Sequence, residues 1–151
     1  MSLWDQLQFL IGSWSSPVSG QPGEGISGST TFSYYLDQKI MIRNSRAEFA
    51  PEPGQKKGLV HEDLLVIYQQ PGESHLRAIY FDNEGHIIHY MVSFPDKQPA
   101  AVFESEATDT SPRARLVYDQ APDGSLGIEF FVAPPGGELV SHVKGKVFRI
   151  L

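Results

Sequence analysis

The chain has 151 residues, of which 40% are hydrophobic, 11% aromatic and 20% charged. This length is typical of one domain with a buried core, and the composition is globular, not disordered. Twelve basic against eighteen acidic residues give a net charge of −6, which counts against nucleic acid and anionic membranes as partners. Cysteine is absent, which excludes disulfides, thiolate nucleophiles and cysteine-ligated metals.

The first residues predict a short helix and no targeting segment. Ser2 and Asp5 fit a capping pair at the helix start, and Gly12 ends the helix. The apolar run at residues 9–11 is too short for a signal peptide or a membrane span, so we expect a cytoplasmic protein. The apolar stripe of the helix consists of Leu3, Leu7, Leu10 and Ile11.

After Gly12 the hydrophobic period changes to two, which predicts strands. Glycine and proline, 14 and 11 residues, cluster between the apolar runs as they do in turns, and the clearest hairpin turn lies at 82–85. No helical pattern separates the runs, which excludes βαβ units and favours an antiparallel meander. The predicted strands lie near 12–18, 25–36, 39–50, 59–69, 75–82, 86–94, 100–107, 113–119, 125–133 and 139–150.

A meander of ten strands has two edges, and closure into a barrel removes both. The sequence therefore predicts an all-β, ten-stranded antiparallel barrel with a short N-terminal helix, as a single domain over residues 1–151. A barrel of this size has room for a side-chain core and one small ligand.

The opening Phe-Leu-Ile-Gly-Ser-Trp at residues 9–14 joins the predicted helix to a Gly-x-Trp on the first strand. Together with the strand count and a terminal arginine, it resembles the calycin barrels, the superfamily of lipocalins, fatty-acid-binding proteins and nitrobindins. The resemblance implies that Trp14 plugs the closed end of the barrel and that Arg149 lies across it as a structural fold marker. A guanidinium group can stack on an indole face and also satisfy carbonyls at the end of a helix.

Arg43 and Arg46 lie on opposite faces of one predicted strand, so one of them points inward. Arg43 shares its face with apolar residues, which favours it as the inward one; an outer-face salt bridge is the alternative. A buried arginine needs a carboxylate partner or an anionic ligand. Arg115 is a second candidate on the same argument. The candidate partners are Glu62, Glu104 and Glu129, and of the neighbours Glu62 and Asp63 one is expected to line the barrel and one to face solvent.

Tyr80 and His89 are the other candidate ligand-binding residues. If the hairpin places Phe81 opposite His86, then Tyr80 and His89 lie on the same face of the sheet. That face carries no full charge, so it is the better candidate for the barrel interior. A hydrogen-bonded wall histidine without a function is the alternative for His89. The expected function is therefore the binding of one small apolar or amphipathic molecule by Arg43, Tyr80, His89 and Arg115.

Two other functions stay open. In nitrobindins a histidine on a late strand ligates haem iron, so the resemblance implies His142 for that role in a haem protein acting on nitrogen oxides or peroxynitrite. Strict alternation places His142 outside the barrel unless a bulge at Gly145 reverses it. The other is a barrel isomerase or cyclase with a lone acid or base. Apart from haem we expect no cofactor and no metal site, and the sequence leaves open a homodimer.

Overall fold

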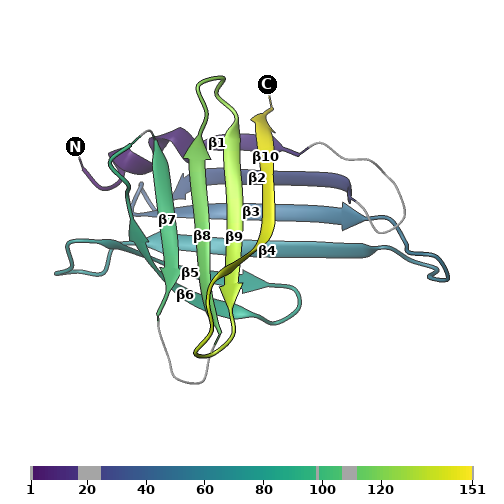
Figure 1. Ribbon diagram of the computed structural model, residues 1–151. Coiled ribbons are helices and arrows are strands. Elements are labelled where there is room, and N and C mark those ends of the chain that lie inside the picture. Colours follow the sequence, from purple (N-terminus) through teal and green to yellow (C-terminus); the bar gives the residue numbers. More distant parts are fainter. Residues whose placement is uncertain (1, 17–24, 98, 107–111, 151) are drawn as a thin grey trace.

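The structure is a computed structural model that describes residues 2–16, 25–97, 99–106 and 112–150. These residues form a six-residue 3-10 helix followed by ten strands, as the sequence predicts (Figure 1). The predicted strand ends at 17–18 and at 107 lie outside the described residues. The elements are η1 (Asp5–Leu10), β1 (Gly12–Ser15), β2 (Gly25–Tyr35), β3 (Ile40–Phe49), β4 (Leu59–Tyr68), β5 (Leu76–Asp82), β6 (Ile87–Ser93), β7 (Ala100–Ser105), β8 (Arg113–Gln120), β9 (Leu126–Ala133) and β10 (Val140–Arg149).

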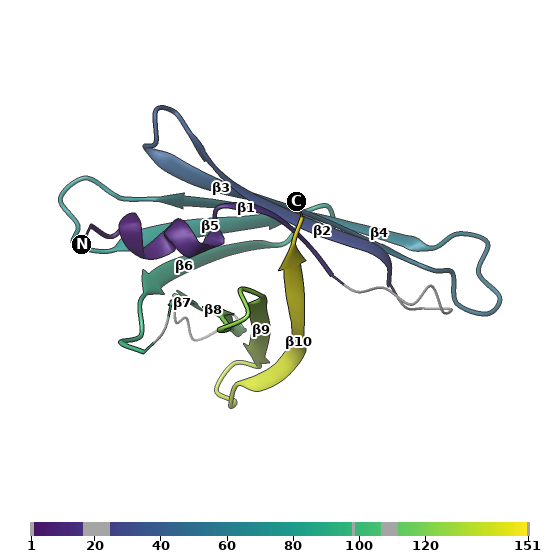
Figure 2. The ribbon, with the colours of Figure 1, turned by 90° about the horizontal axis from the view of Figure 1, so that it is seen from above.

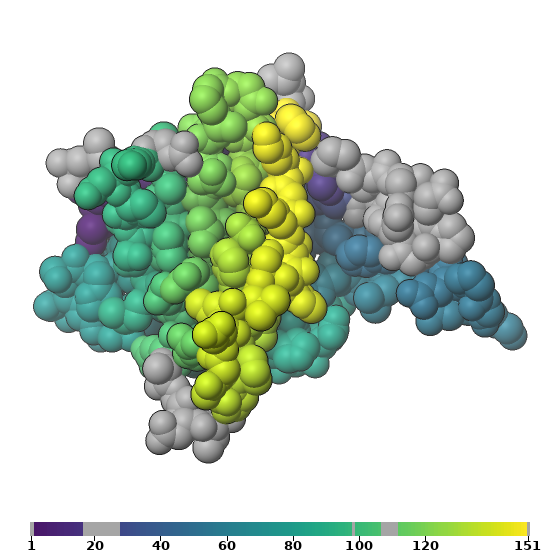
Figure 3. Space-filling model, viewed as in Figure 1, coloured from purple at the N-terminus to yellow at the C-terminus, as the bar shows by residue number. Residues whose placement is uncertain are grey.

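Each strand pairs antiparallel with the next one along the chain, and β10 returns to β1 to close the barrel. The closing register joins Trp14 to Arg149 and Ser15 to Phe148. Seen from above, β2, β3 and β4 cross one side of the molecule, and β7 to β10 form the other (Figure 2). The last strands cover the front face in the space-filling view (Figure 3). The all-β, ten-stranded antiparallel barrel is thus confirmed.

The end of the barrel near η1 is filled with side chains. Alternation along each strand sends every second residue inward, and the inward residues at this end are large and apolar. Leu7 and Leu10 of η1 are fully buried against them. Ser2 and Asp5 exchange hydrogen bonds in front of the helix, at 3.0 and 3.2 Å, as the capping pattern predicts. The packed end includes Trp14, Phe32, Met41, Ile67, Leu76, Phe103 and Leu126.

Trp14 and Arg149 are joined in the way the resemblance implies. The guanidinium carbon of Arg149 lies 4.2 Å from the centroid of the buried Trp14 ring. Its Nη1 donates to the carbonyl of Ile11 at 2.7 Å, and the Trp14 indole donates to the carbonyl of Leu10 at 2.9 Å. Gly12 is needed between them, because its φ is +125° and a Cβ there would lie 2.4 Å from that Nη1.

Candidate functional site

The end of the barrel away from η1 is hollow. A cavity of about 980 Å³ lies there, lined by residues of every strand from β2 to β10. Its floor is at the middle of the barrel, where Arg43, Leu116 and Tyr118 are buried. This volume lies near the upper end of the roughly 300–1,000 Å³ typical of small-molecule sites. The apolar wall above the floor consists of Ile88, Ile128, Phe130, Val132, Val143 and Val147.

Arg43 is the buried cation at the floor, with 5% of its surface exposed. Its Nη1 donates to the hydroxyl of Tyr118 at 2.7 Å, and its Nη2 donates to Oδ1 of Asp63. Its guanidinium carbon lies 5.8 Å from the ring centroid of Tyr80. Nε finds no hydrogen-bond partner among the described residues. Because a guanidinium group carries more N–H donors than these bonds use, Arg43 can donate further.

A series of hydrogen bonds leads from Arg43 toward the rim. Oδ2 of Asp63 lies 3.1 Å from Nε2 of His61, and that nitrogen lies 3.3 Å from the hydroxyl of Tyr80. Tyr80 donates its proton to Oδ2 of Asp82 at 2.9 Å. The side chains belong to neighbouring positions on β3, β4 and β5, where alternation points all of them inward.

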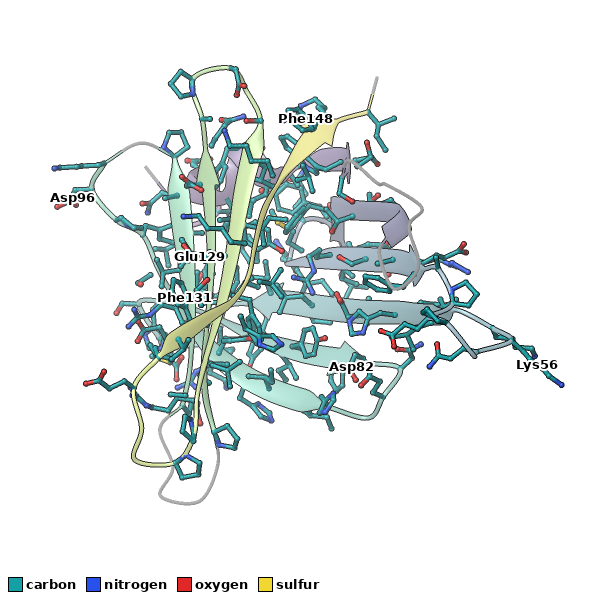
Figure 4. The ribbon with its side chains drawn as sticks, turned by 45° about the vertical axis from the view of Figure 1, so that its right-hand side comes forward. Lys56, Asp82, Asp96, Glu129, Phe131 and Phe148 are labelled. Atoms are coloured by element: carbon teal, nitrogen blue, oxygen red, sulfur yellow. The ribbon has the colours of Figure 1, made fainter. Side chains whose placement is uncertain are left out.

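Asp82 lies at the end of β5, where the chain turns into β6 (Figure 4). It accepts hydrogen bonds from the backbone N–H groups of Glu84 and His86 at 3.0 Å and faces Nδ1 of His86 at 2.9 Å. Burial raises the pKa of Asp82, but the bonds from His86, Tyr80 and Glu84 outweigh burial and lower it to about 2. Asp82 is therefore a carboxylate at neutral pH, and its contact raises the pKa of His86.

The phenols of the cavity stay neutral. Burial raises the pKa values of Tyr80, Tyr90 and Tyr118, and the nearby cation Arg43 offsets only part of that rise. Burial lowers the pKa of Arg43, but Tyr118 and Asp63 more than restore it, so that Arg43 stays charged.

The full charges along the hydrogen-bonded series belong to Arg43 and Asp63 at the floor and to Asp82 at the rim end, where it faces His86. Arg43 contributes a positive charge, whereas Asp63 and Asp82 each contribute a negative one. The floor is thus an internally paired polar cluster and not a free cationic site. The charges nearer the rim come from Arg46, Glu84, Glu106, Arg113 and Lys146.

Arg43 and Tyr80 lie in the cavity, as the sequence predicts. The carboxylate partner of Arg43 is Asp63. The prediction that Glu62, Glu104 or Glu129 pairs with Arg43 is therefore wrong. Glu62 precedes Asp63 on β4 and points outward, so that its side chain is 59% exposed against 11% for Asp63. The expectation of one lining and one solvent-facing carboxylate at this pair is confirmed. Glu129 lies on β9 opposite Val117 and Lys144 (Figure 4). Its neighbours Ile128 and Phe130 line the cavity, so alternation turns Glu129 outward.

The predicted interior position of His89 is wrong. The structure pairs Phe81 with Ile87 and not with His86, so Tyr80 lies opposite Ile88 and His89 opposite Ile79. This shift by one residue moves His89 to the other face of the sheet. The side chain is exposed and reaches the cavity only at its rim. Tyr90 takes the inward place instead.

Arg115 is also predicted inside and lies outside. Its neighbours Ala114 and Leu116 are buried, as is Tyr118 on the same face of β8, so alternation turns Arg115 outward. There its Nε donates to Oε1 of Glu104 at 2.7 Å in a surface ion pair. This pair also explains why Glu104 is not the partner of Arg43.

His142 lies in a β-bulge at the cavity wall. The register of β10 shifts between Ser141 and Val143, whereas Gly145 keeps regular pairing with Ile128. The predicted alternative of a bulge at Gly145 is therefore wrong by three residues. The bulge sets the His142 ring edge-on to Phe130, with centroids 6.5 Å apart, and His142 joins the exposed rim of the cavity.

His61 and Tyr118 are members of the site that are not among the predicted residues, and the prediction left open which of Glu62 and Asp63 lines the barrel. The sequence does contain a signal for these positions. His61, Asp63, Leu65 and Ile67 follow one another at a spacing of two residues, and so do Leu116 and Tyr118. Residues two apart on a strand share a face, so the apolar members mark the inward side.

A second, smaller hollow of about 430 Å³ lies across the outer face of β2 to β5, beside Thr31, Asn44, Glu62 and Phe81. Most of its lining residues are polar, Leu64 and Phe81 add apolar surface, and it opens to solvent. Among the described residues, no group of three or more acidic or histidine side chains could hold a metal ion. Within the same residues, no helix has the length and apolar character to cross a membrane.

The fold and site together define the class: a closed, all-β barrel with a hollow half and a buried ion pair at its floor. Comparison with known proteins finds no matching protein-family model and no match among curated proteins.

Proposed function

We propose that this protein binds one small apolar or amphipathic molecule inside the barrel. The observation that carries the proposal is the cavity of about 980 Å³, with an apolar wall above a buried polar cluster. Small-molecule sites have this composition, because the apolar lining provides affinity and a few fixed polar groups provide orientation. The resemblance to calycin barrels at Gly12, Trp14 and Arg149 supports the same conclusion.

The bound molecule would place its apolar part along β9 and β10 and its polar end at the floor. Phe130 and Val143 offer apolar surface near the opening, and Arg43 offers unused donors below them. Burying about 100 Å² of apolar ligand surface contributes about 2.5 kcal/mol, so a molecule of moderate size gains useful affinity from the wall alone.

The test begins with native mass spectrometry of protein purified without added ligand, read beside its visible absorption spectrum. An additional mass of a few hundred daltons on one protein chain is the expected result. In parallel, the uncharged dye N-phenylnaphthylamine is titrated into the protein. Saturable fluorescence at one site is expected. The absence of both a co-purified mass and saturable dye binding would contradict the proposal.

A second candidate function is haem binding, and the position of His142 favours it. The bulge brings this imidazole to the cavity wall beside Phe130, and the neighbouring wall is apolar. Imidazole is a common axial ligand of haem iron, and an apolar pocket suits the macrocycle. His142 would hold the iron, and bound haem would supply the reactivity toward nitrogen oxides that the nitrobindin resemblance implies.

Titration with hemin tests this candidate. A shift of the Soret band that His142→Ala abolishes and His89→Ala preserves would support haem ligation by His142. His89 is the matched control because it is an exposed histidine at the same rim. Equal spectra for the wild type and His142→Ala would remove His142 as a ligand.

A further inference from the structure

We infer that the cavity selects a molecule whose polar end is uncharged and accepts hydrogen bonds, such as an ester, ketone or amide, over one ending in a carboxylate. This inference rests on the proposed function and names the ligand class for the same cavity. It is carried by the pairing of Arg43 with Asp63, by the second carboxylate of Asp82, and by the unused donors of Arg43.

The charge of Arg43 is already paired inside the protein. A buried guanidinium group without a counter-ion would attract a ligand carboxylate strongly, because the surroundings screen it poorly. Here Asp63 already occupies Nη2 of Arg43, and its side chain is almost as buried as that of Arg43, at 11% and 6% exposed. A ligand carboxylate would therefore meet a neutral pair and not a free cation.

Asp82 adds a second carboxylate between the rim and the floor. It lies on the same hydrogen-bonded series as the Arg43 and Asp63 pair, separated from that pair by His61 and Tyr80, and its side chain is only 3% exposed. A ligand anion that reached the floor would thus lose its hydration past the Asp82 carboxylate and beside a guanidinium group that Asp63 already neutralises. That loss costs several kcal/mol when no cation compensates it.

Arg43 keeps N–H donors beyond those that its two hydrogen bonds use. Nε of Arg43 is buried and, within the described ranges, without a partner, while Nη1 and Nη2 each make a bond to one protein group. A carbonyl oxygen can accept from such donors without bringing charge into the cavity. An ammonium group has donors only, so it matches the negative charge but leaves Arg43 unsatisfied.

The experiment compares three molecules with the same hydrocarbon chain: methyl dodecanoate, dodecanoate and dodecylamine. Each displaces N-phenylnaphthylamine from the protein at slightly alkaline pH, where the acid is ionised and the amine protonated. We expect the ester to bind on the order of tenfold more tightly than either charged molecule, which is a difference of about 1.4 kcal/mol. Tighter binding of dodecanoate or dodecylamine, or equal affinities, would overturn the inference.

Two neighbouring carboxylates provide the variants. Asp63→Asn removes the counter-ion of Arg43 and is expected to raise the affinity for dodecanoate on the order of tenfold relative to the ester. Glu62→Gln removes a negative charge from the outward face and is expected to leave the order of the three affinities unchanged. An unchanged order in a folded Asp63→Asn variant would overturn the inference. If Asp63→Asn does not fold, the affinities of the wild-type protein for the three molecules decide the inference.

The failures of the two proposals are distinguishable. Saturable dye binding with a wrong order of the three ligands overturns the selection and leaves the proposed function standing. Absence of dye binding, together with a bare polypeptide mass, overturns the proposed function and this inference with it.

Discussion

Arg43 shows how one buried charge organises the hollow half of the barrel. Its neighbours across β2 and β4 are Phe32 and Leu65, which are fully buried and offer no hydrogen bonds. The guanidinium group is therefore held by Asp63 and Tyr118 alone among the described side chains. Removal of one charged partner leaves the other charge buried, with neither water nor a counter-ion. That loss of stability is larger than the net stabilisation that the intact pair provides.

We expect Arg43→Met and Asp63→Asn each to lower the free energy of unfolding by about 3 kcal/mol, because each leaves an uncompensated buried charge. The double variant should cost clearly less than the sum of the two. Urea unfolding followed by far-UV circular dichroism measures this double-mutant cycle. The exposed pair Arg46 and Glu62, with atoms 4.0 Å apart, is the control and should cost less than about 1 kcal/mol. Additive losses at the buried pair would contradict the prediction.

The sequence could predict Arg43 but not its partner. Alternation along one strand decides which of Arg43 and Arg46 points inward. The partner depends on how β3 lies against β4, and that register pairs Arg43 with Leu65 and sets Asp63 diagonally opposite. Because the loop between these strands spans residues 50–58, no tight turn fixes the register in the sequence.

Arg149 is expected to matter for stability more than its exposure indicates. It stacks on Trp14 and donates to the Ile11 carbonyl, and the loss of both contacts in Arg149→Ala should cost about 2 kcal/mol. Arg115→Ala, which loses only a surface ion pair, should cost less than about 1 kcal/mol. Chemical denaturation measures both, and equal losses would show that Arg149 has no special structural role.

At the scale of elements, the β5–β6 hairpin explains where prediction from the sequence failed. The ten strands follow from alternation and turn residues, and all of them are found. The hairpin register depends on turn geometry, and here Asp82 N–H donates to the His86 carbonyl while Gly85 takes φ of +92°. The turn therefore closes on Asp82 and His86, one residue off the assumed pairing, and His89 turns outward.

The same hairpin carries a pH dependence. The pKa of Asp82 lies at about 2, below its ordinary 3.8, so its contribution to stability is present above pH 3.8 and is lost as the pH falls through 2. The pKa of His86 lies above its ordinary 6.5, so its contribution is present below pH 6.5 and is lost as the pH rises through the raised value. The contact is therefore strongest in mildly acidic solution.

We expect the His86 ring protons to titrate in NMR spectra with a pKa above 6.5, and Asp82→Asn to return that pKa to the ordinary range. In the wild type, loss of this contact should lower the melting temperature as the pH rises from mildly acidic to mildly alkaline. Asp82→Asn should lack this part of the decline. His89→Gln, on the adjacent strand, is the control and should leave the titration of His86 unchanged. A His86 pKa that Asp82→Asn does not move would contradict the assignment.

At the scale of the whole molecule, the barrel divides into a packed half and a hollow half. The inward residues near η1 are large and fill their end, as in Trp14 and Phe103, whereas small residues such as Ala47, Ser105 and Ala114 leave space beside the apolar wall of the other half. A well-packed core excludes voids larger than a water molecule, and a cavity of about 980 Å³ lacks such packing. The packed half therefore has to provide the apolar burial that the hollow half lacks. Most of the apolar packing that stabilises the barrel therefore lies at the end opposite the cavity.

This division predicts that the hollow half can be filled without unfolding the protein. Ala47 lines the cavity near its opening, and Ala47→Phe would place a ring in open space instead of overpacking a core. We expect its melting temperature to change little, while the affinity for N-phenylnaphthylamine falls on the order of tenfold or more. Ala50→Phe adds the same ring outside the cavity lining and should bind the dye as the wild type does. Undiminished dye binding by a folded Ala47→Phe variant would place the binding site elsewhere on the molecule.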